Sequence, residues 1–186
     1  PEVMQAVLDL GVDIVNDIWA LRQPGAERVV ALHPSCGVCL MHMHRDPQTM
    51  QLQTMSGDVV SAVQQFLQGR LQNLLTQGVD IDRLVLDPGI GFGKTVDQNF
   101  ELLARQSDLM ALDRPVMAAW SRKSSLGAVL AQDGPIPPPS QRLSASVAAA
   151  LMAVDRGARL VRVHDVKATV DALRVWQAVQ SAAPQN

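Results

Sequence analysis

Short apolar runs and helical segments alternate along this chain of 186 residues. Five runs are typical of strands, because each stops at turn residues. They span residues 13–17, 37–43, 84–87, 115–119 and 159–165. Apolar residues recur at helical spacing in further segments, at 1–10, 25–32, 58–78, 98–110, 140–154 and 167–182. The alternation predicts parallel strands connected by helices, and therefore an α/β fold.

Three of these helices carry apolar stripes that we expect to face the core. Asp58 is expected to cap the helix at 58–78, and Ser140 the helix at 140–154. The stripes consist of Val59, Val63, Phe66, Leu67, Leu71, Leu74 and Leu75, then Leu143, Val147, Leu151 and Val154, and finally Val170, Leu173 and Trp176.

The stretch 84–95, which reads LVLDPGIGFGKT, ends a strand in an acid, a proline and three glycines. Ligands bind at the carboxyl ends of parallel strands, and glycines let the backbone approach them closely. Asp87 beside such a floor suits a flat heterocycle with ring N–H donors, although a strand followed by a flexible turn also fits. Pro88 excludes a Walker A loop, and the G-x-G-x-G spacing excludes the dinucleotide fingerprint.

Composition narrows the class of protein. A hydrophobic content of 47% in 186 residues suits one core and a single domain. The net charge of −2 gives no reason to expect a nucleic-acid or membrane-surface partner. The longest apolar run, 147–154, is too short to span a bilayer, and no signal peptide is visible. We therefore expect a cytoplasmic protein.

Two pairs of residues could be interpreted as metal ligands. Cys36 and Cys39 form a lone C-x-x-C, which is at most half a zinc site, and Cys39 is interpreted as a core residue. His42 and His44 share one face of a strand, but no third ligand is obviously placed with them.

Cations follow the last two strands. Arg122 and Lys123 stand between two serines just past residues 115–119, where they could hold an anion or a carbonyl-bearing ring, or form a solvated basic turn. Arg162 and His164 share a face of the last strand. Burying Arg162 without a partner would be costly, so an anion such as diphosphate, or a protein carboxylate, is expected beside it. Polar residues at strand ends are typical of a (β/α)₈ barrel active site.

Five segments together resemble dihydropteroate synthase, in the order and at about the spacing of that family, over essentially the whole chain. The combination of S-R-K-S with R-V-H-D-V is the most specific part of the resemblance. The segments are I-V-N-D at 14–17, C-L-M-H-M at 39–43 with P-x-T-M-Q at 47–51, L-D-P-G-x-G-F-G-K at 86–94, S-R-K-S at 121–124 and R-V-H-D-V at 162–166.

The resemblance implies a (β/α)₈ barrel transferase of folate biosynthesis. Such an enzyme joins 6-hydroxymethyl-7,8-dihydropterin diphosphate to p-aminobenzoate, releases diphosphate with the help of Mg²⁺, and is the sulfonamide target. Carried over by motif, the pterin contacts would be Asn16, Met41, Asp87, Gly91, Phe92 and Lys123. Ser124 and Lys123 would contact p-aminobenzoate, and Arg162 and His164 the diphosphate, so that Lys123, Arg162 and His164 are the catalytic candidates.

The resemblance also implies that part of the barrel precedes this chain. The family has three more strands, and residues 1–186 would begin inside the helix after the third. We therefore expect one N-terminally truncated pterin-binding domain, an incomplete barrel of about five strands and six helices, which is inactive alone. The magnesium-binding asparagine would lie in the missing part, and the full-length protein would be a homodimer.

Two alternatives remain open. The first is the pterin-binding domain of a corrinoid methyltransferase, which would share the barrel and the acid but would not be expected to keep Lys123, Arg162 and His164. The second is a non-catalytic paralogue that binds a partner. Preference for methyltetrahydrofolate over pterin diphosphate would favour the first alternative.

Overall fold

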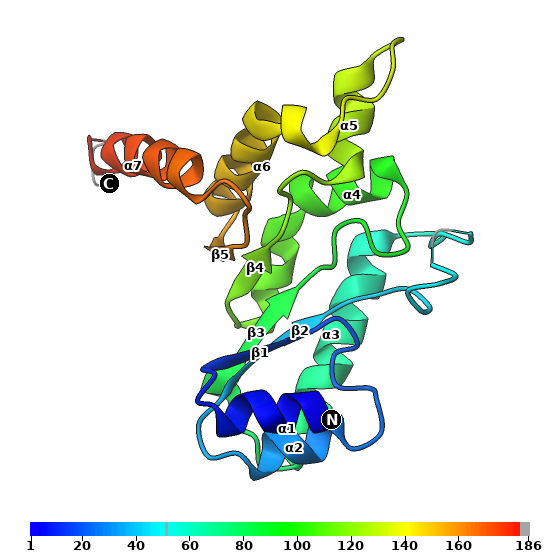
Figure 1. The fold of residues 1–186 in the computed structure, drawn as a ribbon, viewed down its shortest axis with the longest axis vertical. Coiled ribbons are helices and arrows are strands. Elements are labelled where there is room, and N and C mark those ends of the chain that lie inside the picture. Colours follow the sequence, from blue (N-terminus) through cyan, green and yellow to red (C-terminus); the bar gives the residue numbers. More distant parts are fainter. Residues whose placement is uncertain (51, 183–186) are drawn as a thin grey trace.

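A computed structural model describes residues 1–50 and 52–182, and within them five parallel strands form one sheet in the order β1-β2-β3-β4-β5 (Figure 1). The strands are β1 (Ile14–Asp17), β2 (Gly37–Met41), β3 (Leu84–Asp87), β4 (Val116–Ala118) and β5 (Ala158–Val161). This confirms the predicted α/β fold. Strands β2 and β5 are shorter than predicted, because the chain leaves the sheet soon after each of them. The last bond to the neighbouring strand runs from the His42 N–H to the Asp87 carbonyl (2.9 Å) after β2, and from the Arg162 N–H to the Ala118 carbonyl (3.0 Å) after β5.

The described residues contain seven α-helices and three 3₁₀ helices, so one more α-helix is present than predicted. None of the helices in this part of the chain is long and apolar enough to cross a membrane. The α-helices are α1 (Glu2–Asp9), α2 (Ala26–Leu32), α3 (Val59–Thr76), α4 (Val96–Ala104), α5 (Ser124–Ala131), α6 (Leu143–Asp155) and α7 (Val166–Ala182). The 3₁₀ helices are η1 (Ile81–Arg83), η2 (Gln106–Leu112) and η3 (Pro139–Gln141).

Helix α3 follows the prediction closely. The Asp58 side chain accepts hydrogen bonds from the N–H groups of Val60 and Ser61, and therefore caps the helix as expected. Its predicted stripe is buried or half-buried except for Leu75 in the last turn, which is 40% exposed. No regular helix or strand lies between β2 and α3 in the described residues, and Gln51 of the P-x-T-M-Q motif lies outside them.

The segment predicted as one helix at 98–110 is two elements. Helix α4 begins at Val96, where Thr95 and Gln98 form a capping box, and it ends at Ala104 before η2 takes over. The side chain of Gln106 is buried in η2 and donates to the Ala153 carbonyl (2.8 Å), so a bond to α6 fixes this turn.

Three predictions for the C-terminal third are wrong. Ser140 caps no helix, because it lies in η3 and α6 begins after Arg142. The predicted large residues of α6 are only half-buried or exposed. Its buried face consists of small side chains, which allow close packing: Ser146, Ala149, Ala150 and Ala153. Val170 is 38% exposed, because α7 projects from the body and packs on α6 (Figure 1).

The strand register brings the carboxyl ends of the strands to one edge of the sheet. Met41 is the partner of Asp87, both being the last residues of their strands, and Asn16 on β1 is the partner of Cys39 on β2. The sheet is open, with β1 and β5 at its two edges. The loops that follow the strands are therefore neighbours, and they carry the predicted site.

Candidate functional site

Asp87 is the buried centre of the site, at 1% exposure. Its Oδ1 accepts a hydrogen bond from the Gly89 N–H (2.7 Å), but its buried Oδ2 has no partner among the described residues. Burial raises the pKa of this carboxyl, while the Gly89 N–H and the charges of Lys123, Arg162 and Lys94 oppose that rise. A buried acceptor without a partner is costly, and a ligand that donates an N–H would satisfy it.

The loop after β3, residues 88–95 (the glycine loop), is shaped by left-handed backbone at Gly89, Gly91 and Gly93, with φ of +68°, +83° and +72°. Other residues adopt this conformation at a cost. The loop lies against the segment that follows β2. The His44 N–H donates to the Phe92 carbonyl (3.5 Å), and the Met55 N–H donates to the Gly93 carbonyl (3.0 Å). It thus presents backbone rather than bulky side chains beside Asp87.

Lys123 reaches over the glycine loop from the turn after β4. Its Nζ donates to the Ile90 carbonyl (2.7 Å) and lies 4.6 Å from the centre of the Phe92 ring. Burial lowers the pKa of this amine, whereas the nearby Asp87 raises it and Arg162 lowers it. The structure therefore brings together four predicted site residues, namely Asp87, Gly91, Phe92 and Lys123.

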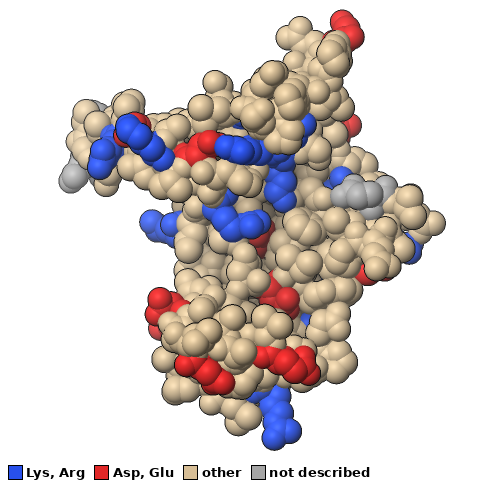
Figure 2. All heavy atoms as spheres, in the orientation of Figure 1, with Lys and Arg blue, Asp and Glu red and all other residues tan. Residues whose placement is uncertain are grey.

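The loop after β5 adds further cations. Arg162 is close enough to act electrostatically on Asp87 and Lys123, and the backbone N–H of His164 donates to Ser121 Oγ (3.1 Å), which also lies 3.0 Å from its Nδ1. Arg162 directly follows β5 and its side chain is exposed, so the cost of burying its charge without a partner does not arise among the described residues. Figure 2 shows Lys and Arg gathered over β4, β5 and α7, with Asp and Glu more frequent over α1 and α2.

The turn with Arg122 is held in place from three sides. Arg122 has a left-handed backbone (φ +60°), and its guanidinium pairs with Asp165, with Nε–Oδ2 and Nη2–Oδ1 distances of 3.1 and 2.7 Å. Its N–H donates to Ser146 Oγ (2.9 Å), and its carbonyl accepts from Arg142 (2.8 Å). Arg122 is thus engaged by protein, which leaves Lys123 as the cation of this turn that faces Asp87.

Three predicted residues lie around this cluster. Met41 is buried and pairs with Asp87 in the sheet. Asn16 lies on the exposed side of the edge strand β1, and Ser124 is exposed at the first position of α5. Both are at the same edge of the sheet as Asp87, but neither belongs to the buried cluster.

The candidate metal ligands have other surroundings. His42 is buried, with Nδ1 2.9 Å from Lys94 Nζ and its ring edge-on to Phe66, and Cys36 and Cys39 are buried free thiols. Cys39 is a core residue, as predicted. Over residues 1–50 and 52–182, no three His, Cys, Asp or Glu side chains gather in a way that could hold a metal ion.

Two buried polar residues of the site carry no predicted role. Lys94 bonds three groups around the glycine loop, and Asn99 on α4 accepts from Gly91 N–H (2.8 Å) and donates to Ser125 Oγ (3.0 Å). The sequence held one signal for Lys94, a cation directly after three glycines. For Asn99 only a polar residue amid the apolar spacing of the helix could have indicated burial.

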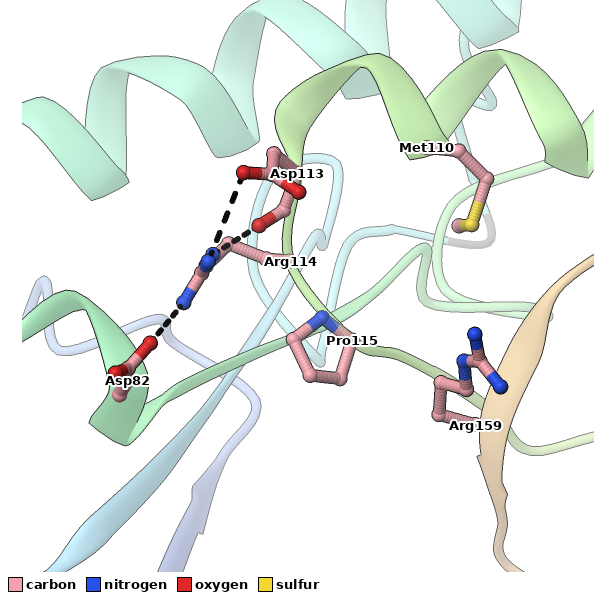
Figure 3. Close-up of a pocket in the computed structure, with 6 residues that line it drawn as sticks. All are labelled: Asp82, Met110, Asp113, Arg114, Pro115 and Arg159. Carbon is pink, nitrogen blue, oxygen red and sulfur yellow. Dashed lines mark hydrogen bonds and ion pairs between the residues drawn. The ribbon is translucent and has the colours of Figure 1, made fainter.

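A cavity of about 520 Å³ is lined by residues outside this cluster, and Figure 3 shows those residues. Its lining comes from the amino ends of the strands, since Pro115 directly precedes β4 and Arg159 lies at the start of β5. Arg114 in this cavity pairs with Asp82 (2.9 Å) and Asp113 (3.9 Å), as Figure 3 shows. Ligands of parallel sheets bind at the opposite end, so we place the candidate site at Asp87.

The chain is similar to known proteins in both sequence and fold. A family model described as pterin binding enzyme matches residues 1–164. Dihydropteroate synthase of Haemophilus influenzae is 44% identical over 181 residues, which are 97% of this chain and 63% of that protein. This chain therefore spans about 63% of the length of that curated relative.

Two solved structures are similar over the whole chain. The dihydropteroate synthase of Stenotrophomonas maltophilia, with imidazole bound in its active site, gives a TM-score of 0.93 at 48% identity, covering 100% of this chain and 68% of that one. The Burkholderia cenocepacia dihydropteroate synthase in complex with 7,8-dihydropteroate gives 0.91 at 52% identity, covering 100% and 67%.

Proposed function

The chain belongs to the dihydropteroate synthase family, and from this premise we propose that it is part of an enzyme that makes 7,8-dihydropteroate. The substrates would be 6-hydroxymethyl-7,8-dihydropterin diphosphate and p-aminobenzoate, and diphosphate would be the second product. One observation carries this proposal: the buried carboxylate of Asp87 keeps an oxygen without a partner, beside a glycine loop and within reach of three cations.

The pterin ring would bind at Asp87. Oδ2 of this carboxylate accepts ring N–H groups, which is the interaction that the described residues leave open. Lys123 and the Phe92 ring form one wall, Met41 and the backbone of Gly91 the floor, and Asn16 contributes a further hydrogen bond from β1. The Burkholderia relative was solved with 7,8-dihydropteroate, a molecule that contains such a ring.

The leaving diphosphate would bind at Arg162 and His164. The bond between the pterin methylene and the diphosphate oxygen breaks, and its electron pair leaves with the diphosphate. Fixed positive charges stabilise this developing charge, a term that is commonly large in enzymes. The amino nitrogen of p-aminobenzoate then bonds to the methylene carbon and loses a proton, while Ser124 holds the carboxylate and Lys123 orients the ring.

Magnesium does not fit the residues described here. No group of three or more His, Cys, Asp or Glu side chains in residues 1–50 and 52–182 could hold the ion, so we assign it no step. We propose that a magnesium ligand lies in a part of the enzyme outside residues 1–186, which we place as one portion of a single (β/α)₈ barrel domain. By the same family argument, the whole protein would be a cytoplasmic, homodimeric sulfonamide target, and residues 1–186 alone would be inactive.

The other candidate functions are less well supported. A corrinoid methyltransferase domain has no leaving diphosphate, and so has no use for Lys123, Arg162 and His164 at one edge of the sheet. A non-catalytic paralogue has no need of a buried carboxylate with an open oxygen, which costs stability. Neither alternative accounts for the cluster as directly as a pterin diphosphate does.

The test uses the full-length protein that contains these residues. Purified protein with both substrates and Mg²⁺ is expected to release diphosphate and form dihydropteroate, and Lys123→Ala is expected to lose most of this activity. Lys167→Ala is the matched control, because Lys167 is exposed on α7 and, among the described residues, pairs with Asp171 alone. Unchanged turnover in Lys123→Ala would reject its assigned role, and preferential binding of methyltetrahydrofolate would reject the synthase assignment.

A further inference from the structure

Lys94, at the end of the glycine loop, is a buried amine that the proposed reaction does not use. It is 4% exposed, and its Nζ contacts three acceptors. They are the Gly89 carbonyl at 2.8 Å, the Phe92 carbonyl at 3.2 Å and His42 Nδ1 at 2.9 Å. Two of the acceptors belong to the glycine loop itself and the third to the residue after β2, so a single side chain ties the loop to the neighbouring strand.

The three contacts match the donors of an ammonium group. Lysine in its charged form has three N–H donors and no acceptor, so in that form Lys94 donates to Nδ1 of His42, which carries its imidazole proton on Nε2. Burial, with Lys94 as the next cause, lowers the pKa of His42 to about 2, which keeps this ring neutral. No carboxylate hydrogen-bonds Lys94 in the described residues, and burying such a cation is costly. A stability role alone does not explain that arrangement.

The charge of Lys94 acts on Asp87. The ammonium lowers the pKa of the Asp87 carboxyl, and Asp87 in turn raises the pKa of Lys94, which burial has lowered to about 7. Lys94 and Lys123 thus both favour the ionised form of the acid. The other charged or titratable groups that act on Asp87 or His42 are Arg162, Arg22 and His44, and Asp87 in turn raises the pKa of the Cys39 thiol.

We propose that Lys94 is a positioning residue for the pterin ring: its ammonium closes the glycine loop onto His42 and keeps the Asp87 carboxylate ionised for the ring N–H donors. This inference rests on the proposed function and deepens it. Lys94 does not touch the substrate in this account. It acts through the positions of Gly89 and Phe92 and through the charge state of Asp87.

The experiment measures binding of a plain pterin without diphosphate to the full-length protein by calorimetry, over a range of pH. Lys94→Met removes the charge and all three hydrogen bonds, whereas Lys94→Gln removes the charge but keeps an amide donor for the loop carbonyls. We expect affinity to fall at least about tenfold in Lys94→Met and less in Lys94→Gln. In both, the acid limb of binding should move to higher pH, by about one unit, because Asp87 has lost a neighbouring cation.

Lys167→Met is the control for the substitution itself, and it should leave affinity and pH profile unchanged. If Lys94 only holds the loop in shape, the variants would lose pterin affinity without a shift in the pH at which binding is lost on the acid side. That result, or wild-type affinity in both variants, would overturn the inference. Should Lys94→Met fail to fold, the pH dependence of pterin binding by Lys94→Gln on the acid side tests the inference instead. If the unmodified protein binds no pterin at any pH, the proposed function fails first and the role of Lys94 with it.

Discussion

The carbonyl oxygen of His42 lies where a side chain at position 89 would begin, since a Cβ built on Gly89 meets that oxygen at 1.8 Å. A methyl group at this position forces the glycine loop away from β2, in addition to the strain of a positive φ. We expect Gly89→Ala to lower the free energy of unfolding by about 3 kcal/mol or more and to abolish pterin binding.

The control for this prediction is Gly78→Ala. Gly78 has a similar φ (+81°), but a Cβ there meets nothing within 4 Å. Urea unfolding should show a loss of about 1–2 kcal/mol for this variant, from backbone strain alone. Equal losses in the two proteins would mean that the contact with His42 does not decide the shape of the loop.

Asp87→Asn tests the open carboxylate oxygen. The amide keeps the size of the side chain but replaces one carboxylate oxygen by an NH₂ group. That group is a donor and cannot accept a hydrogen bond from the ring N–H groups. We expect pterin affinity to fall about 10- to 100-fold with the protein still folded, as measured by calorimetry and thermal melting. Asp82→Asn, an exposed acid paired with Arg114 far from the site, should bind pterin normally. Wild-type affinity in Asp87→Asn would remove this residue from the pterin site.

Asn99 joins the pterin side of the site to α5. Its side chain is 1% exposed, accepts from Gly91 and donates to the Thr95 carbonyl (2.8 Å) and to Ser125 Oγ. Asn99→Leu removes all three bonds at similar volume and is expected to cost about 1–3 kcal/mol and to raise KM for both substrates.

Ser125→Ala separates the two effects of that change. It removes only the bond to α5, whose first residue, Ser124, is proposed to hold p-aminobenzoate. We expect KM to rise for p-aminobenzoate and to stay near the original value for the pterin. Steady-state kinetics of the full-length enzyme measure both, and an equal rise for the two substrates would speak against Asn99 as the link.

His42 makes the fold sensitive to acid. Its pKa is lowered from 6.5 to about 2 in the native state, mainly by burial, so between these values the unfolded chain binds a proton that the folded chain does not. Stability therefore falls as pH falls below 6.5, by up to about 1.4 kcal/mol per pH unit from this residue. His42→Gln lacks the effect, and urea midpoints between about pH 5 and 8 should fall less steeply for it. Parallel pH dependences would contradict the prediction.

The sequence predicted the sheet well because its strands are short apolar runs bounded by turn residues, a signal that needs no tertiary information. It did not predict α5, whose early positions Ser124, Ser125 and Gly127 are weak helix formers. Tertiary contacts favour the helix there: Gly127 lies against the Arg142 guanidinium, with a built Cβ 2.7 Å from Nε. The buried face of α6 was not predicted either, because it consists of alanine and serine, which do not stand out as an apolar stripe in the sequence.

Phe92 came only from the family resemblance, whereas Asp87 and Lys123 were predictable because one ends a parallel strand and the other follows one, and parallel strand ends meet at one edge. The burial of Lys94 was not, since a lysine in a glycine-rich turn is normally solvated. Only the closed loop, with two of its own carbonyls turned inward, gives that amine partners. Arg162 is the reverse case, because it directly follows β5 and its charge is exposed to solvent.

The order of the strands in the sheet, β1-β2-β3-β4-β5, is also their order in the chain. During synthesis each new strand can therefore dock on the one made just before it, and no strand has to be inserted between two that have already paired. The paired strands are nevertheless far apart in the sequence, since Ile14 pairs with Gly37 and Val38 with Leu84, and such non-local parallel pairing is slow to form. The residues proposed for the site come from all five strand ends, so the pocket is completed only when Arg162 and His164 have left the ribosome. Assembly of the sheet is gradual, whereas completion of the site is a late and single event.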